Sequence, residues 1–128
     1  MIFSYFYFPA EMSGLLRRNV NFKKNRTMGI KKTYSKGKPE CKVTFSVSAE
    51  NVPEKSKVFL AGDFNNWEEQ SLRLKKNKAG DYSISLTLPA PNRYQFKYNI
   101  DGEYWINDDA ADAYPQNAFG SDNSMIEL

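Results

Sequence analysis

The stretch Arg93-Tyr-Gln-Phe-Lys-Tyr-Asn-Ile100 alternates without interruption between large apolar or aromatic residues and polar ones. Successive side chains of a β-strand point to opposite faces of its sheet, so the apolar set should share one buried face and Lys97 should face away from the core. The stretch therefore predicts a half-buried strand. The residues expected in the core are Tyr94, Phe96, Tyr98 and Ile100.

The same period of two recurs on both sides of this strand. Residues 41–48 and 81–88 alternate in the same way, and the Asp101-Gly102 dipeptide is a strong hairpin signal. Strands at intervals of about ten residues, with turns between them and no helical periodicity, indicate an all-β fold, an antiparallel immunoglobulin-like β-sandwich. Further strands are expected over residues 57–61, 72–74, 103–106 and 124–128.

The positive charge of the chain is concentrated near its N-terminus. Residues 1–40 contain nine Lys or Arg against two acidic residues, whereas residues 41–128 contain nine basic and thirteen acidic residues. The basic balance therefore belongs to the first 40 residues, and we expect the following domain to bind no nucleic acid.

Two residue types that carry much enzyme chemistry are scarce. The chain has no histidine, which excludes a Ser-His-Asp triad and histidine-ligated zinc. The one cysteine, Cys41, cannot form an intramolecular disulfide or a cysteine-based zinc cluster, and it fits a reducing compartment, with the cytoplasm as the expectation. The acidic pairs Glu68-Glu69 and Asp108-Asp109 lack the spacing of a calcium-binding loop. We therefore expect no catalysis, no metal site and no cofactor.

Residues 1–40 are expected to form a basic leader and linker, disordered or poorly packed, ahead of a domain over residues 41–128. The apolar start over residues 1–8 is too short to span a bilayer, which needs about 20 apolar residues, and it lacks the pattern of a signal peptide. Three interpretations stay open: an interfacial membrane anchor, a disordered extension, and a true translation start at Met28. Residues 31–40 contain Gly37 and Pro39 and are typical of a linker.

Several blocks of the domain, in the right order, resemble the family 48 carbohydrate-binding modules. This early-set domain stands at the front of isoamylases and glycogen-branching enzymes, and it forms the glycogen-binding domain of the beta subunit of AMP-activated protein kinase. The resemblance covers roughly residues 41–128, and the chain from Met28 onward is also similar to small stand-alone bacterial early-set proteins. The blocks are Gly62-Asp-Phe-Asn-Asn-Trp67, Tyr94-Gln-Phe-Lys97, Ile100-Asp-Gly102, Trp105-Ile-Asn-Asp108 and Phe119-Gly-Ser-Asp-Asn123.

The resemblance implies a sugar site of two aromatic rings, a lysine, a bulky apolar residue and an asparagine. By motif, Trp67 and Lys97 supply one ring and the lysine. Phe119 stands where the kinase subunit has leucine, and Asn123 matches its asparagine. The motif spacing places the second ring at either Tyr104 or Trp105.

The length of the hairpin loop decides between these two aromatic residues. With a two-residue loop, Asn99 pairs with Tyr104, which then shares the face of Lys97. With a three-residue loop and a bulge at or just after Gly102, Asn99 pairs with Trp105 instead. We favour Trp105, because a bulge most simply absorbs the one extra residue.

The function that the resemblance implies is non-catalytic binding of an α-1,4-linked glucan, glycogen or starch-like, or of a maltooligosaccharide. The rings would stack on sugar rings, while the Lys97 ammonium and the Asn123 amide would hydrogen bond to hydroxyls. The alternative is a structural or protein-interaction domain that docks a carbohydrate-active enzyme without binding sugar itself.

Overall fold

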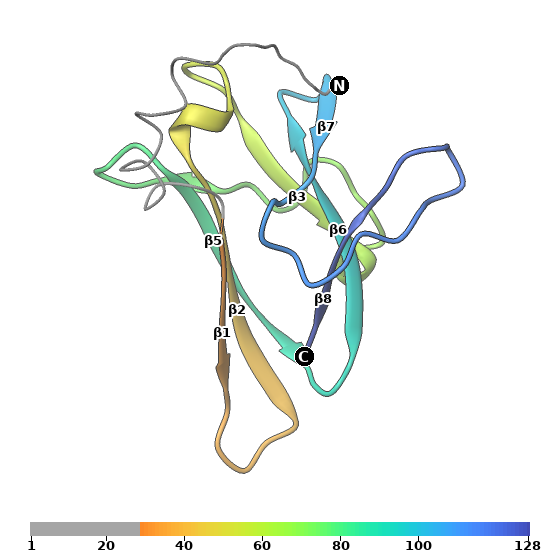
Figure 1. The fold of residues 1–128 in the computed structure, drawn as a ribbon. Coiled ribbons are helices and arrows are strands. Elements are labelled where there is room, and N and C mark those ends of the chain that lie inside the picture. Colours follow the sequence, from red (N-terminus) through yellow and green to blue (C-terminus); the bar gives the residue numbers. More distant parts are fainter. Residues whose placement is uncertain (1–28) are drawn as a thin grey trace, which may run out of the picture.

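The computed structural model describes residues 29–128, which form two antiparallel sheets packed face to face (Figure 1). The first sheet, sheet A, has the strand order β1-β2-β5-β4, and the second, sheet B, has β3-β6-β7, with β8 also paired to β6. This architecture confirms the predicted all-β sandwich. The strands are β1 (Gly29–Tyr34), β2 (Glu40–Val47), β3 (Val58–Gly62), β4 (Lys75–Lys76), β5 (Tyr82–Pro89), β6 (Arg93–Ile100), β7 (Tyr104–Ile106) and β8 (Ser124–Glu127).

Helical structure in the described residues is limited to two short 3-10 turns, η2 (Ala49–Asn51) and η3 (Asp63–Asn65). Neither of them, nor any other part of residues 29–128, forms a helix long and apolar enough to cross a membrane.

The core lies between the inner faces of the two sheets, as the alternation of β6 predicts. Phe96 on β6 packs against Phe45 on β2 with ring centroids 5.1 Å apart, so the two central strands meet through their aromatic side chains. Polar residues take the outer positions of both strands, because a pleated strand buries only every second side chain. All four predicted residues of β6 are buried: Tyr94, Phe96, Tyr98 and Ile100.

The prediction of a linker over residues 31–40 is wrong for its first part. Strand β1 pairs with β2 along its whole length, and the Gly-Pro signal marks the hairpin loop between them, closed by a hydrogen bond from the Ser35 N–H to the Glu40 carbonyl (3.0 Å). The pattern did not reveal β1 because an edge strand rich in lysine lacks a continuous apolar face. The predictions for residues 1–28, including the start at Met28, fall outside the described residues.

The weak strand expected over residues 72–74 is also displaced. Arg73 makes a single bridge to Phe59 of β3, and the regular strand β4 begins two residues later, at Lys75, paired with β5. Hydrogen bonds from the Leu60 N–H to the Leu72 carbonyl and from the Leu74 N–H to the Val58 carbonyl, both 2.8 Å, hold this segment to sheet B. The chain thus crosses from sheet B to sheet A here, too quickly for one strand to form.

The hairpin between β6 and β7 has a three-residue loop, which settles the pairing of the two aromatic residues that follow. Ile100 pairs with Tyr104, and Asn99 pairs with Trp105. The Ile100 carbonyl also accepts a hydrogen bond from the Glu103 N–H (2.9 Å), so Glu103 is the extra residue on the returning side. By this register Trp105, and not Tyr104, shares the outer face with Lys97.

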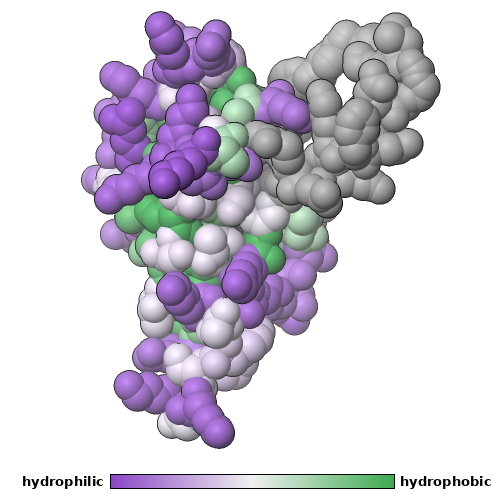
Figure 2. All heavy atoms as spheres, turned by 90° about the vertical axis from the view of Figure 1, so that its left-hand side faces the viewer, coloured by the Kyte–Doolittle hydropathy of each residue, from purple (hydrophilic) through white to green (hydrophobic). Residues whose placement is uncertain are grey.

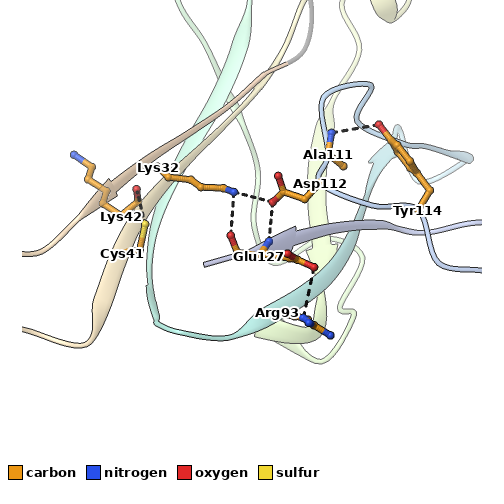
Figure 3. Close-up of polar contacts among 8 residues, drawn as sticks. All are labelled: Lys32, Cys41, Lys42, Arg93, Ala111, Asp112, Tyr114 and Glu127. Atoms are coloured by element: carbon orange, nitrogen blue, oxygen red, sulfur yellow. Dashed lines mark hydrogen bonds and ion pairs between the residues drawn. The ribbon is translucent and has the colours of Figure 1, made fainter.

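Lys32 closes the open edge between the sheets (Figure 3). It lies on the side of β1 that faces sheet B, and its Nζ donates to Asp112 Oδ2 (2.7 Å) and to the Glu127 carbonyl (3.0 Å). The Glu127 N–H donates to the same Asp112 oxygen (2.7 Å). Burial alone would raise the pKa of Asp112, but these hydrogen bonds and the Lys32 charge hold it below its usual value. One inward-pointing charge at a sheet edge thus links β1, β8 and the loop before β8.

Candidate functional site

A cleft of about 590 Å³ opens on the outer face of sheet B. Strand β6 and the β7 hairpin form its floor, and two long loops, residues 63–71 after β3 and residues 107–123 before β8, form its sides. The lining residues are Asp63, Trp67, Glu69, Gln95, Lys97, Trp105, Asn117, Phe119, Ser121 and Asn123. The cleft therefore combines aromatic surface with hydrogen-bonding side chains from parts of the chain that are far apart in sequence.

One amide side chain organises the loop over residues 63–71. Asn65 Oδ1 accepts a hydrogen bond from the buried Gly62 N–H (2.9 Å). Its Nδ2 donates to the Glu68 carbonyl (3.1 Å) and to Ser71 Oγ (2.9 Å). An irregular loop has no ladder to satisfy its backbone groups, so a side chain that makes several such bonds fixes its path.

Trp67 is held in an unusual backbone conformation at the mouth of this loop. Its φ is 58°, and that of Asn66 before it is 57°. A left-handed conformation is common for asparagine but uncommon for a bulky residue, and it costs on the order of 1–3 kcal/mol. The Trp67 N–H donates to the Gly62 carbonyl (2.9 Å), and the indole Nε1 donates to Asp63 Oδ1 (3.0 Å). These bonds keep the ring at the cleft.

Asp63 joins the tryptophan loop to the sheet. While one carboxylate oxygen accepts from Trp67, the other accepts from the Gln95 N–H of β6 (2.8 Å). The carboxylate is therefore occupied by two internal hydrogen bonds, which suits a structural role and leaves it poorly placed to act as a catalytic base.

Trp105 forms the second aromatic wall. Its ring centroid is 6.5 Å from that of Trp67, with an angle of 61° between the ring planes. Both side chains are partly buried, so each ring keeps part of its surface open. Two rings tilted in this way form a corner and cannot both lie against one flat surface.

Lys97 lies between the two loops, half-buried, on the outer face of β6. Its Nζ donates to the Asp122 carbonyl (2.8 Å), which leaves two ammonium protons for other acceptors. Burial lowers the pKa of Lys97, and the nearby Asp122 carboxylate partly offsets that effect. The side chain is thus held in the cleft and can make further hydrogen bonds.

Asn123 and Gln95 form a linked pair of amides beside Lys97. Asn123 Nδ2 donates to Gln95 Oε1 (2.9 Å), and Asn123 Oδ1 accepts from Asn117 Nδ2 (2.9 Å). An amide has further donor and acceptor capacity beyond these bonds. The network fixes which atom of Asn123 points which way.

Phe119 projects from the loop before β8 with 93% of its surface exposed. Side-chain hydrogen bonds hold the turn beneath it, because Asn117 Oδ1 accepts from the Phe119 N–H (2.8 Å) and the Ser121 N–H (3.2 Å). Gly120 completes the turn with a φ of 84°, a value that glycine adopts at little cost. A large apolar ring on a fixed turn, almost fully exposed, is a feature expected of a binding surface.

The structure brings five of the six proposed binding residues to this cleft: Trp67, Lys97, Trp105, Phe119 and Asn123. Tyr104, 38% exposed, does not line it, because the hairpin register places its backbone opposite Ile100. Lining residues that were not among the six proposed binding residues are Asp63, Glu69, Gln95, Asn117 and Ser121. Of these, Gln95 could have been found from its position two residues before Lys97 on the same strand face.

No group of three or more Cys, Asp or Glu residues within residues 29–128 is placed to hold a metal ion. The polar side chains of the cleft carry amides, one ammonium, one hydroxyl and two carboxylates, and beside its aromatic rings they offer hydrogen-bond donors and acceptors.

A comparison with known families gives a match that covers more than half of the chain. The family described as the glycogen recognition site of AMP-activated protein kinase matches residues 51–128. No curated protein matches the chain. The matched segment begins before β3 and includes every lining residue of the cleft.

Proposed function

Because this chain belongs to the family of the glycogen recognition site of AMP-activated protein kinase, we propose that it binds an α-1,4-linked glucan, glycogen or starch-like, without catalysing a reaction. The observation that carries the proposal is the open corner between Trp67 and Trp105, with Lys97 beside it. We further propose that the protein works in the cytoplasm, as the single cysteine suggests.

The aromatic corner suits the shape of the ligand. A glucose ring presents a face of C–H groups that can lie on an aromatic ring, while its hydroxyls point sideways. Successive units of an α-1,4-linked chain are turned relative to one another, so the chain curves. Rings inclined by 61° fit two units of a curved chain better than they fit a flat β-1,4-linked chain.

Polar side chains around the corner supply the hydrogen bonds. The free protons of Lys97 can donate to ring hydroxyls, and the amides of Asn123 and Gln95 can both donate and accept. Phe119 can press against the sugar chain from the opposite side of the cleft. Because these groups are already oriented by internal hydrogen bonds, little side-chain entropy is lost on binding.

A single site of this kind should bind weakly. Each aromatic contact contributes about 1 kcal/mol beyond its buried area, and the cleft is open to solvent. A branched polymer offers many chain ends, so retention on glycogen will exceed the affinity for one short oligosaccharide whenever several copies of the protein act together.

Native gel electrophoresis in the presence of glycogen tests this function. The protein should be retarded, maltoheptaose should relieve the retardation, and Trp67→Ala should abolish it. Absence of retardation for a folded sample would rule out glucan binding and favour a domain that docks a carbohydrate-active enzyme without binding sugar.

A further inference from the structure

A second cleft, of about 500 Å³, differs in chemistry from the aromatic one. Four of its seven lining residues are cations and none is acidic, and we call it the basic cleft. Three segments form it: the turn before β3, the crossing between the sheets, and the start of β5. The lining residues are Lys55, Ser56, Arg73, Leu74, Lys75, Lys76 and Tyr82.

Backbone contacts hold the segment that carries three of the cations of the basic cleft. The hydrogen bonds of Leu72 and Leu74 to β3 hold Arg73 to sheet B, whereas Lys75 and Lys76 pair with β5 of sheet A. The Lys76 ammonium lies 5.8 Å from the centre of the Tyr82 ring. The three cations thus stand on one short segment that both sheets hold.

Lys55 adds a fourth charge from a strained turn. Its φ is 64°, in a turn closed by a hydrogen bond from the Ser56 N–H to the Pro53 carbonyl (3.2 Å). Glycine or asparagine is the usual residue at such a position, and a lysine there is uncommon. The turn therefore holds a lysine in a backbone conformation that is unfavourable for it. This lysine lines a cleft that already contains three other cations.

The cations of the basic cleft form no salt bridge with another described residue. The salt bridges among residues 29–128 join Lys32 to Asp112 and Arg93 to Glu127, and none involves a cation of the basic cleft. Like charges gathered around one cavity attract an anion. Arginine binds phosphate oxygens in a bidentate manner and lysine binds them as a point charge, so a phosphate monoester suits this set of donors.

The basic cleft lies at the edge between the two sheets, since its lining residues Leu74 and Tyr82 belong to the core, and Arg73 connects it to the outer face of sheet B. Arg73 pairs with Phe59, Phe59 with Asn99, and Asn99 with Trp105, so these residues form one row across the outer face. Three strand spacings of about 4.8 Å separate Arg73 from Trp105, or roughly 14 Å. A glucan held at Trp105 therefore has to extend by roughly 14 Å to bring a phosphate group to Arg73.

We propose that the basic cleft binds a phosphate monoester carried by a sugar, and that the full ligand of the protein is a phosphorylated α-glucan. The preference for phosphate is inferred from the four cations of the basic cleft, and the link to a glucan rests on the function proposed above. A neutral glucan would use the aromatic cleft alone, whereas a phosphorylated one would use both.

Calorimetric titration at low ionic strength tests the proposal with maltoheptaose, maltoheptaose 6-phosphate, glucose 6-phosphate and inorganic phosphate. The phosphorylated heptasaccharide should bind about tenfold more tightly than the neutral one, the effect of one added charge-assisted contact. Arg73→Gln/Lys75→Gln/Lys76→Gln should abolish that advantage and leave the affinity for maltoheptaose unchanged. The control, Lys36→Gln/Lys38→Gln/Lys42→Gln, removes the same charge from exposed positions around the β1–β2 hairpin and should keep the advantage.

The possible failures can be told apart. Equal affinity for neutral and phosphorylated maltoheptaose would overturn this inference alone. If the control variant also loses the tighter binding of the phosphorylated sugar, that tighter binding comes from the net charge of the protein and not from the basic cleft, and the inference is wrong. If inorganic phosphate binds as tightly as glucose 6-phosphate, the sugar part of the inference is wrong. If neutral maltoheptaose does not bind, the function proposed above fails. Glucose 6-phosphate then still tests the basic cleft, through its effect on the backbone amide resonances of Arg73, Lys75 and Lys76.

Discussion

The outer faces of the two sheets follow the same alternating pattern but differ in what surrounds them. The outer face of sheet A carries small hydroxyl and lysine side chains, with Thr44 and Ser85 hydrogen bonded across β2 and β5 (2.7 Å). Figure 2 shows the side of the molecule that is on the left in Figure 1, toward β5, where hydrophilic side chains crowd the upper part and the lower end and hydrophobic surface appears near the middle. Sheet B instead carries both tryptophans at its outer face.

Much of the difference comes from the loops that border sheet B. The hairpin between β1 and β2 is short, whereas two long loops fold against the outer side of sheet B and are held there by side chains, Asn65 in one and Asn117 in the other. A regular sheet face becomes a cleft only where such loops border it. The predictions below test this contrast, beginning with the change that should disturb it most.

Asn65→Ala should have the largest effect. It removes four hydrogen bonds and leaves the buried Gly62 N–H without its acceptor, which should lower the free energy of unfolding by about 2 kcal/mol and abolish glucan binding. Urea unfolding and glycogen gels measure the two effects. Asn65→Asp keeps the acceptor for the Gly62 N–H and loses the donors, so its stability and its glycogen binding should both be intermediate. If Asn65→Ala binds glycogen normally, the side chain does not organise the loop.

Trp105→Ala should weaken maltoheptaose binding at least about tenfold, with little loss of stability, because its ring is partly exposed. The matched control is Tyr104→Ala, which removes the neighbouring aromatic side chain from the other face of the strand. Calorimetry should find the affinity of this control unchanged. Equal losses in the two variants would show that the hairpin register does not define the site.

A buried pair beneath the loop of residues 107–123 should make stability depend on alkaline pH. Tyr98 donates to Asp108 Oδ2 (2.7 Å), and burial, followed by the Asp108 charge, raises the pKa of Tyr98 well above its usual value. In the unfolded chain this tyrosine ionises near pH 10, so the folded state holds more protons above that pH and stability should fall. Urea unfolding between pH 8 and about 11 should show a steeper decline than in Tyr98→Phe. Parallel curves would contradict the assignment.

Lys32→Met should have the smallest effect, a loss of about 0.5–1 kcal/mol, since the Lys32–Asp112 pair is partly exposed. Because these contacts hold the pKa of Asp112 low, their contribution should be present above pH 4 and disappear as the pH falls through the lower, folded pKa. Unfolding curves at pH 7 and pH 3 measure it. Lys42→Met, on the outer side of β2, is the control, and an equal loss there would show that the ion pair contributes nothing specific.

The strands of the core could be predicted from the sequence because burial imposes a period of two. Strands β2, β5 and β6 follow that rule, and register alone then placed Trp105 with Lys97. Strand β1 escaped prediction because it is an edge strand, paired on one side and rich in lysine. For such strands, pairing with a neighbour matters more than the pattern of the strand itself.

The candidate site was predicted only as far as its motif residues. The hydrogen bonds that build it join residues distant in sequence, such as Asp63 with Gln95 and Asn123 with Gln95, and no local pattern reports them. The basic cleft was missed for the same reason, since Lys55 and Arg73 come together only when the chain crosses between the sheets.

Intrinsic tryptophan fluorescence tests the central claim most directly, because the chain has two tryptophans and both line the aromatic cleft. Titration with maltoheptaose should change the emission in a saturable way, and cellohexaose, a β-linked chain, should not. Trp105→Ala should remove the saturable change although one tryptophan remains. A folded protein whose emission does not respond to maltoheptaose would contradict the account.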